Sequence, residues 1–269
     1  MSDRNLASAT GAELRAAIRI GEHIGPTAGL ARGYVQANVV IIPAVDADDF
    51  AEFCRLNPRP CPVICRTPSG DPRPAGVAPG ADLRTDVPRY RVFRSGVAEA
   101  NEPTDIGPLW RDDLVGFLLG CSFTFDNALR AAGLVLRHEE EGKNVPMYRT
   151  NIPCASAGKF AGPLVVSMRP LHPDQVPLAR RITGAYPAMH GEPVHVGDPA
   201  AIGIANLARP DFGQSVTIRD GEVPVFWACG VTPQLALENA RCDLAITHSP
   251  GAMFVTDLSE QDFRTGAID

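Results

Sequence analysis

Two histidines next to predicted strand ends are the side chains best suited to acid–base chemistry in this sequence. His248 directly follows an apolar run and precedes a turn, and open α/β sheets bind ligands at such positions. His190 begins a second segment that holds two histidines and two carboxylates. Because imidazole titrates near neutral pH, either histidine could take or give a proton. We take His248 as the first catalytic candidate and His190 as the second.

The second segment also allows a metal site. His190, His195 and Asp198 would supply a His/His/Asp set of ligands. Their odd separation places the two histidines on opposite faces of a continuous strand, although Gly191 and Pro193 leave room for a bend. No recognised zinc-ligand spacing is present. We therefore expect no metal and no other cofactor.

Two turns of the same kind follow two predicted strands, and each leads into a predicted helix. One contains Gly120 and Ser122, and the other contains Gly230 and Thr232. Backbone N–H groups at a helix N-terminus carry partial positive charge, so they can hold a carboxylate or a tetrahedral oxyanion. Thr232 is expected to cap its helix, with Pro233 in the first helical position. Ser122, Gly230 and Thr232 are therefore predicted to bind substrate.

Each of these turns also carries a cysteine. A thiol at a helix N-terminus can have a lowered pKa and act as a nucleophile, but a free cysteine is more often a small buried core residue. For Cys121 the core interpretation is preferred. For Cys229 the two interpretations are balanced, and it is kept as a third catalytic candidate.

Arg149 and Arg169 each stand among short polar residues in predicted strand contexts. A guanidinium can grip a carboxylate through two hydrogen bonds, which a dicarboxylate substrate would require. A surface salt bridge explains either arginine equally well. Asn38 shares one face of an apolar strand with Gln36, and a buried amide needs a hydrogen-bond partner. Both arginines and Asn38 are therefore candidate substrate-binding residues.

The elements that must position these residues alternate between strand and helix along the chain. A capping box at Thr10 and Glu13 opens the first helix, and residues 58–88 form a long irregular stretch. Such alternation predicts an α/β fold. Apolar runs predict strands at residues 34–42, 90–93, 114–119, 164–168, 223–228, 243–247 and 253–257.

Composition excludes several classes of function. The 269 residues carry a net charge of −6, which gives no electrostatic footprint for nucleic acid. No apolar run is long enough to cross a membrane, and the glycine-rich nucleotide-binding and G-x-S-x-G hydrolase motifs are missing. Seven cysteines, an odd number, favour reduced thiols and a cytoplasmic protein. The oligomeric state stays open, and a homo-oligomer is compatible with the sequence.

Long motifs of the chain resemble those of the D-glutamate cyclase family. The match is collinear from about residue 10 to the C-terminus. It includes GYVQAN at 33–38, FAEFCRLNPRPCP at 50–62, GCSFTFD at 120–126, VPMYRTN at 145–151, VVSMRP at 165–170, HGEPVHVGDP at 190–199, FWACGVTPQ at 226–234 and ITHSPG at 246–251.

The resemblance implies a two-part mixed α/β architecture, in which a smaller α+β domain is inserted into a larger layered α/β domain. We expect residues 1–110 together with 215–269 to form the larger domain and residues 111–214 the smaller one. The resemblance also implies a lyase. The eukaryotic relative is similar to a D-glutamate cyclase, and the bacterial members are called hydro-lyases by analogy. The family supplies no catalytic residues, so the site residues above come from their chemistry alone.

The expected function is a hydro-lyase acting on a small carboxylate substrate, an amino dicarboxylate. D-glutamate cyclisation to 5-oxo-D-proline with loss of water is the favoured reaction. One alternative is a hydro-lyase for a hydroxy acid, with a metal at His190, His195 and Asp198. Another is a carboxylate-binding protein without turnover. In a fourth reading Cys229 attacks a γ-carboxyl derivative, and alkylation would then inactivate the enzyme.

Overall fold

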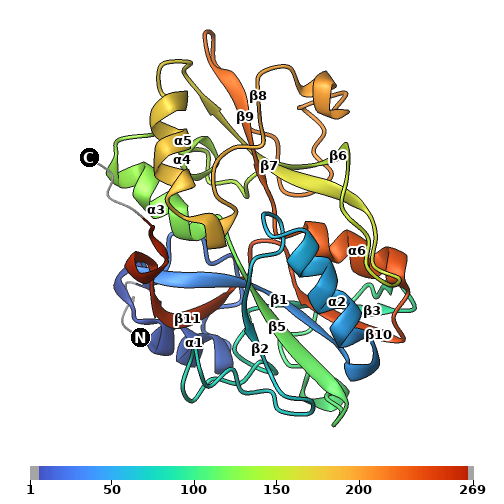
Figure 1. Cartoon of the computed structure of the whole chain (residues 1–269). Helices are drawn as coiled ribbons and strands as arrows, with labels where there is room; N and C mark the ends of the chain where they lie inside the picture. The colour runs from blue at the N-terminus through green and yellow to red at the C-terminus, as the bar shows by residue number, and fades with distance from the viewer. Residues whose placement is uncertain (1–5, 266–269) are drawn as a thin grey trace.

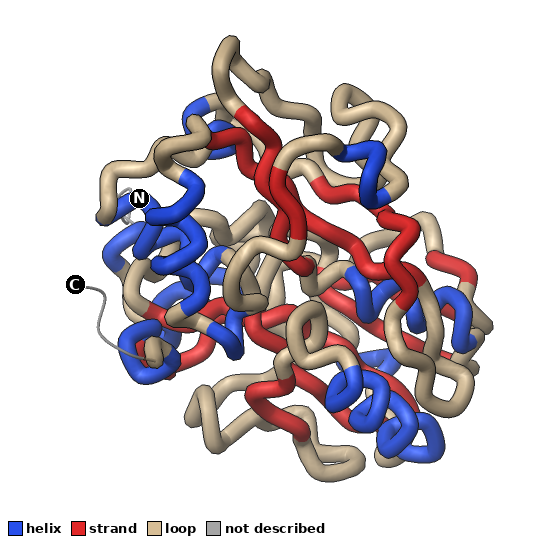
Figure 2. The backbone as a smooth tube through the Cα atoms, turned by 45° about the horizontal axis from the view of Figure 1, so that its top comes forward, coloured by secondary structure: helices blue, strands red, loops and turns tan. Residues whose placement is uncertain are grey.

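Two antiparallel sheets form the frame of the protein in the computed structural model, which describes residues 6–265. Figure 1 shows the smaller sheet above the larger one, with helices along the flanks, and Figure 2 shows the same strands from another side. The seven-stranded sheet has the order β2-β5-β1-β10-β3-β4, and β11 also pairs with β1; the four-stranded sheet has the order β6-β7-β9-β8. The predicted mixed α/β fold class is confirmed.

The bounds of the elements are as follows. The larger sheet contains β1 (Tyr34–Pro43), β2 (Val63–Arg66), β3 (Tyr90–Arg94), β4 (Val97–Ala98), β5 (Leu114–Gly120), β10 (Leu244–His248) and β11 (Phe254–Ser259). The smaller sheet contains β6 (Met147–Pro153), β7 (Pro163–Leu171), β8 (His195–Val196) and β9 (Val223–Ala228). The α-helices are α1 (Gly11–Arg19), α2 (Ala44–Leu56), α3 (Phe123–Ala131), α4 (Arg137–Glu140), α5 (Val176–Gly184) and α6 (Thr232–Ala240). Short 3-10 helices are η1 (Leu6–Ser8), η2 (Gly107–Leu109), η3 (Pro187–Met189), η4 (Pro199–Ile202) and η5 (Glu260–Phe263).

A local sequence signal accounts for the start of the first α-helix. Thr10 caps α1: its hydroxyl accepts from the Glu13 N–H at 3.2 Å, and the Glu13 carboxylate accepts from the Thr10 N–H at 2.8 Å. The predicted capping box is therefore confirmed.

None of the helices between residues 6 and 265 has the length and apolar character needed to cross a membrane.

Strand β1 is the centre of the larger sheet. It pairs with β5 from Ala37 to Pro43, with β11 towards its N-terminal end and with β10 at Val40 and Ile41. Between the segments of β1 that pair with β11 and with β10, the backbone N–H of Val39 donates to the His248 imidazole Nδ1 at 3.1 Å. The side chain of His248, the last residue of β10, thus provides a hydrogen-bond acceptor for the backbone of β1.

Apolar side chains fill both faces of each sheet. Phe50, Phe53 and Phe160 pack on the face of the larger sheet that α2 and α6 cover. On its other face lie buried side chains from the irregular stretch after β2, among them Leu83 and Val87. This part of residues 58–88 therefore forms a fixed cover of the core. The smaller sheet packs through Trp227 and its neighbours against α3 and α5.

The predicted domain boundaries do not coincide with the division between the sheets. β5 lies within residues 111–214 but belongs to the larger sheet, whereas β9 follows residue 214 but belongs to the smaller sheet. As a result, β5 and β9 each carry the chain from one sheet towards a helix beside the other (Figure 1). A division of the chain into two domains stays a prediction.

Candidate active site

A buried polar cluster centred on Arg169 lies where the two sheets meet. β7 alternates its side chains, so Val166 and Met168 pack in the outer core of the smaller sheet while Ser167 and Arg169 face inward. Arg169 has no exposed surface. Its Nη2 donates to Asp126 Oδ2 at 2.7 Å and to Ser122 Oγ at 3.2 Å, and its Nη1 donates to Ser167 Oγ at 3.1 Å.

Two adjacent aromatic rings line the Arg169 guanidinium. Its central carbon lies 5.3 Å from the ring centroid of Phe125 and 5.4 Å from that of Trp227. Burial raises the pKa of the Asp126 carboxyl, while the Arg169 charge opposes that rise. The cluster therefore places an ion pair in a dry environment, where electrostatic interactions are stronger than in water.

His190 lies beside this cluster in a left-handed backbone conformation with φ of 78°. Its Nδ1 is 2.7 Å from the carbonyl oxygen of Arg59. Since a carbonyl can only accept, Nδ1 carries the proton and Nε2 has the free lone pair. Burial, together with the nearby Arg169 charge, lowers the pKa of His190 to about 4. His190 is therefore neutral near pH 7 and able to accept a proton at Nε2.

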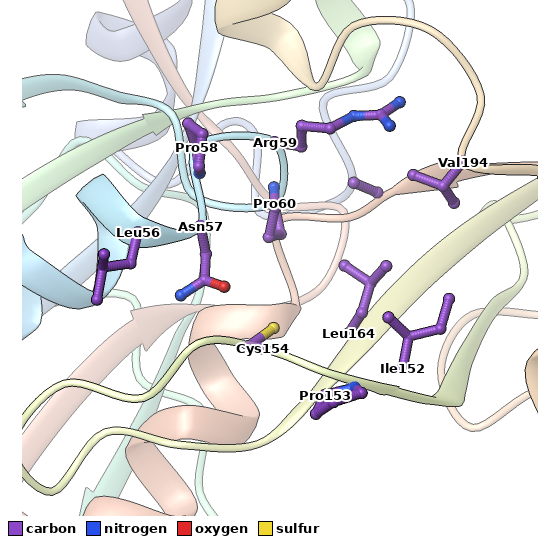
Figure 3. Close-up of a pocket in the computed structure, with 11 residues that line it drawn as sticks. Leu56, Asn57, Pro58, Arg59, Pro60, Ile152, Pro153, Cys154, Leu164 and Val194 are labelled. Atoms are coloured by element: carbon purple, nitrogen blue, oxygen red, sulfur yellow. The ribbon is translucent and has the colours of Figure 1, made fainter.

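A pocket of about 350 Å³ is lined in part by Arg59, whose carbonyl oxygen is the hydrogen-bond partner of His190. Figure 3 shows apolar side chains of β6 and β7 facing the loop of residues 56–60, with the Arg59 guanidinium extending away from Cys154. The Arg59 Nη2 donates to the carbonyl oxygen of Glu192. Arg59 thus connects an accessible hollow with the buried His190.

The two glycine turns meet at this junction. A Cβ on Gly120 would lie 1.9 Å from the carbonyl oxygen of Ala188, and a Cβ on Gly230 would lie 2.1 Å from Asn38 Nδ2. The Asn38 Nδ2 donates to the carbonyl oxygen of Gly120 at 2.8 Å. Asn38 therefore bonds to one turn and packs against the other. The Ala188 backbone leaves no room for a side chain at position 120, and a side chain at position 230 would displace Asn38.

Thr232 has a different role from the predicted one. It is the first residue of α6, and Val231 occupies the cap position without a side-chain hydrogen bond. The Thr232 hydroxyl accepts from the Val165 N–H at 3.0 Å and donates to the Val165 carbonyl at 3.3 Å. The prediction that Thr232 caps the helix is wrong, because its side chain fastens α6 to β7. Ser122 precedes α3 but makes no cap bond, since its hydroxyl accepts from Arg169.

Cys121 and Cys229 pack in one apolar cluster between the turns. Burial raises the pKa of Cys229 to about 11 and that of Cys121 to about 12. This is opposite to the lowering that sequence reasoning considered for a nucleophile, because desolvation outweighs the helix N-terminus here. Both thiols are protonated near pH 7.

His248 lies on the opposite face of the larger sheet from Asn38. It stands across from Tyr90 of β3, which packs in the core on that face. Its Nδ1 accepts from Val39, so its proton resides on Nε2, and burial lowers its pKa to about 4. The rule that favoured His248 applies to the carboxyl ends of parallel strands, whereas β10 is antiparallel to both neighbours. The structure therefore separates His248 from the Arg169 cluster.

Arg149 also lies apart from the cluster. Its side chain is 48% exposed and stands 3.8 Å from Asp211 and 3.9 Å from Glu238. It lines a polar surface hollow of about 410 Å³ together with Arg209. The two arginines chosen from the sequence thus occupy different environments.

The candidate metal ligands are used in other ways. His195 Nε2 lies 2.7 Å from the carbonyl oxygen of Asp198, and the Asp198 carboxylate accepts from the Ala200 N–H at 3.0 Å. In the part of the chain that the structure describes, no group of three or more His, Cys, Asp or Glu side chains is placed to hold a metal ion.

Asp126, Ser167 and His138 belong to the cluster but were not candidates from the sequence. Asp126 follows Ser122 by one helical turn, so both face Arg169. An acidic residue next to the two phenylalanines of the first turn was the available signal. His138 of α4 is buried, and its pKa falls to about 3 through burial and then through the Arg169 charge.

Comparisons with known proteins agree with these motifs. The sequence profile of a family described as D-glutamate cyclase matches residues 115–257, more than half of the chain. A relative from Rubrobacter xylanophilus named "Putative hydro-lyase" is 62% identical over 252 residues, which cover 94% of this chain and 97% of the relative. A relative of the same general name from Bacillus licheniformis is 57% identical over 251 residues, covering 93% and 95%.

Among solved structures, a nitrogen repressor-like protein from Methanococcus jannaschii overlaps with a TM-score of 0.38 at 8% identity, covering 94% of this chain and 99% of its own. A likeness of this size gives no information on function. The sequence relatives are informative: they confirm the predicted resemblance and the expectation of an enzyme in the lyase class. The chain belongs to the D-glutamate cyclase family.

Proposed function

We propose that the protein is a hydro-lyase that cyclises D-glutamate to 5-oxo-D-proline with loss of water. The observation that carries the proposal is the buried Arg169 cluster beside His190, whose Nε2 lone pair is free of hydrogen bonds to other described residues. An amino dicarboxylate needs a cation for its carboxylate and a base for its ammonium group. The family supports the same chemistry.

Between heavy atoms, the reaction forms one C–N bond and breaks one C–O bond. The amine nitrogen bonds to the γ-carboxyl carbon, and a C–O bond of that carboxyl breaks. Two of the three ammonium protons leave the nitrogen and end on the departing oxygen as water. The enzyme must therefore remove protons from nitrogen, deliver them to oxygen and hold the chain in a folded conformation.

In this proposal His190 Nε2 takes a proton from nitrogen and returns it to the departing oxygen. Arg169 holds a carboxylate, and the N–H groups of the turns at Ser122 and Gly230 stabilise the tetrahedral oxyanion. Asn38 keeps the two turns together. The Cys229 thiol lines the site in its protonated form and is not the nucleophile.

We place the protein in a reducing compartment, the cytoplasm, because its seven cysteines are all free thiols. A homo-oligomer stays a prediction.

An NMR time course with D-glutamate, L-glutamate and 5-oxo-D-proline, with and without EDTA, tests the reaction. We expect interconversion of the D-isomers alone, unchanged by EDTA. A reaction that EDTA abolishes would favour the metal-assisted hydro-lyase, and saturable binding without product would favour the non-catalytic reading.

Substitution of the two buried histidines tests the assignment of the base. We expect His190→Gln to lower turnover by about 10²–10⁴-fold, the range of general acid–base catalysis. His248→Gln is the matched control, since His248 is equally buried and also has a pKa of about 4. If a folded His248→Gln protein loses turnover and His190→Gln keeps it, His248 is the base.

A further inference from the structure

Three buried polar atoms around the Arg169–Asp126 pair have no hydrogen-bond partner. They are Arg169 Nε, Asp126 Oδ1 and His138 Nε2, on side chains that are at most 2% exposed. Buried polar groups are normally satisfied by protein or ordered water, so an unsatisfied donor and acceptor on one ion pair require an explanation. Arg169 influences the titration of both other groups, which places all three atoms in one region.

The free atoms differ in a useful way. Arg169 Nε can only donate, and an ionised Asp126 Oδ1 can only accept. A ligand that satisfies both must offer an acceptor and a donor close together. The ammonium and carboxylate groups on the α-carbon of an amino acid are such a pair, and each carries the charge opposite to that of the atom it would meet.

We propose that the Arg169–Asp126 pair is the receptor for the α-ammonium and α-carboxylate groups of the substrate, and that Asp126 selects amino acids over hydroxy acids. This inference rests on the proposed function and identifies its substrate class. Asp126 Oδ1 accepts from the ammonium group and Arg169 Nε donates to the carboxylate, and the unsatisfied Nε2 of His138 lies in the same region.

Discrimination follows from the charge of Asp126. An α-hydroxy acid offers a neutral hydroxyl in place of the ammonium, and a deaminated acid offers nothing. Asp126 Oδ1 would then have only a weak hydrogen-bond donor, or none. Sites built to hydrogen-bond a substrate group strongly reject analogues that lack it, because a buried polar atom is left unpaired. The Phe125 and Trp227 rings exclude water from the pair and strengthen this preference.

Entry to these atoms requires a covering segment to move, since the cluster has almost no exposed surface. Residues 187–191 are suited to this because they pack over Gly120 and end in two consecutive residues with positive φ, His190 at 78° and Gly191 at 69°. Such conformations are uncommon for a non-glycine residue.

Calorimetric titration of the His190→Gln protein tests the inference, because that variant keeps Asp126 and Arg169 and turns over slowly on the proposed function. The probes are D-glutamate, D-2-hydroxyglutarate and glutarate. We expect D-glutamate to bind at least about tenfold more tightly than the other two. Equal affinity for D-glutamate and D-2-hydroxyglutarate would overturn the inference. So would binding of none of the probes, which would leave ordered water as the partner of the free atoms.

Asp126→Asn in the same background should remove the preference for D-glutamate. Asp257→Asn is the matched control: Asp257 pairs with buried Arg15 at 2.8 Å, away from the cluster, so this variant should keep the preference. If Asp126→Asn fails to fold, the series of three ligands decides alone. Failure of the proposed function is separate, since it appears as no conversion of D-glutamate by the wild-type protein while an Asp126-dependent preference persists.

Discussion

Arg169 and Arg149 stand on neighbouring paired strands and looked alike in the sequence, yet they occupy opposite environments. Arg169 is fully buried, with a carboxylate at 2.7 Å and two adjacent aromatic rings beside its guanidinium. Arg149 is half exposed, with carboxylates at 3.8 and 3.9 Å. The arginine that faces inward from the smaller sheet is desolvated, whereas Arg149 lines a hollow on the protein surface. The same side chain thus forms an exposed ion pair in one place and a candidate binding site in the other.

The largest expected effect is on stability. Arg169→Met leaves Asp126 buried without its cation, which should lower the free energy of unfolding by about 3–5 kcal/mol. Arg149→Met removes only exposed, loosely paired charge, and it should change that free energy by about 0–1 kcal/mol. Urea denaturation of both variants measures the difference. Similar losses in the two variants would break the comparison.

A smaller expected effect is the pH dependence of stability that Glu260 causes at the edge of the buried cluster. Burial raises the pKa of Glu260 from 4.5 to about 7, although Asn127 donates to its carboxylate. Below pH 4.5 the folded and unfolded states both hold the proton. Between 4.5 and 7 only the folded state does, so stability falls as pH rises and the whole penalty is present above 7.

Glu260→Gln should remove this pH dependence. We expect the variant to gain on the order of 1–3 kcal/mol over the wild type at pH 8, relative to the difference between them at pH 4. Thermal or urea unfolding at the two pH values measures the gain. A constant difference between the proteins would show that Glu260 keeps an ordinary pKa.

The smallest expected effect is that of alkylation on turnover. Cys154 lines the open pocket and is partly exposed, whereas Cys229 is buried at the junction. At pH 8 iodoacetamide should modify Cys154 before Cys229, because Cys154 is the more exposed of the two. Turnover of D-glutamate should stay unchanged while Cys229 remains unmodified, as followed by peptide mass spectrometry. Activity lost in proportion to Cys229 modification would instead support the thiol mechanism.

Features that depend on neighbouring residues could be predicted from the sequence. The capping box at Thr10 lies within four residues, and strand β9 has the predicted bounds Val223–Ala228. The alternation of elements was enough for the fold class. These signals depend on local backbone geometry and apolar periodicity, which the chain carries in every short segment.

The environment of each candidate could not be read in this way, because it depends on distant pairings. Arg169 meets Asp126 across 43 positions of sequence, and nothing local distinguishes it from Arg149. His248 was favoured by a rule for parallel sheets, but the strands around it are antiparallel. For Cys229 the sequence left the nucleophile and core interpretations balanced, because the desolvation that raises its pKa depends on packing from both sheets. The catalytic and substrate-binding roles of all these residues stay predictions.

The position of β1 also governs when the protein can fold during its synthesis. This strand is made well before two of its three strand partners, β10 and β11, and the Val39–His248 hydrogen bond spans 209 positions. Until β10 and β11 leave the ribosome, β1 presents an unpaired apolar edge, the kind of surface that promotes aggregation. Completion of the central sheet therefore has to wait for the synthesis of both of these strands.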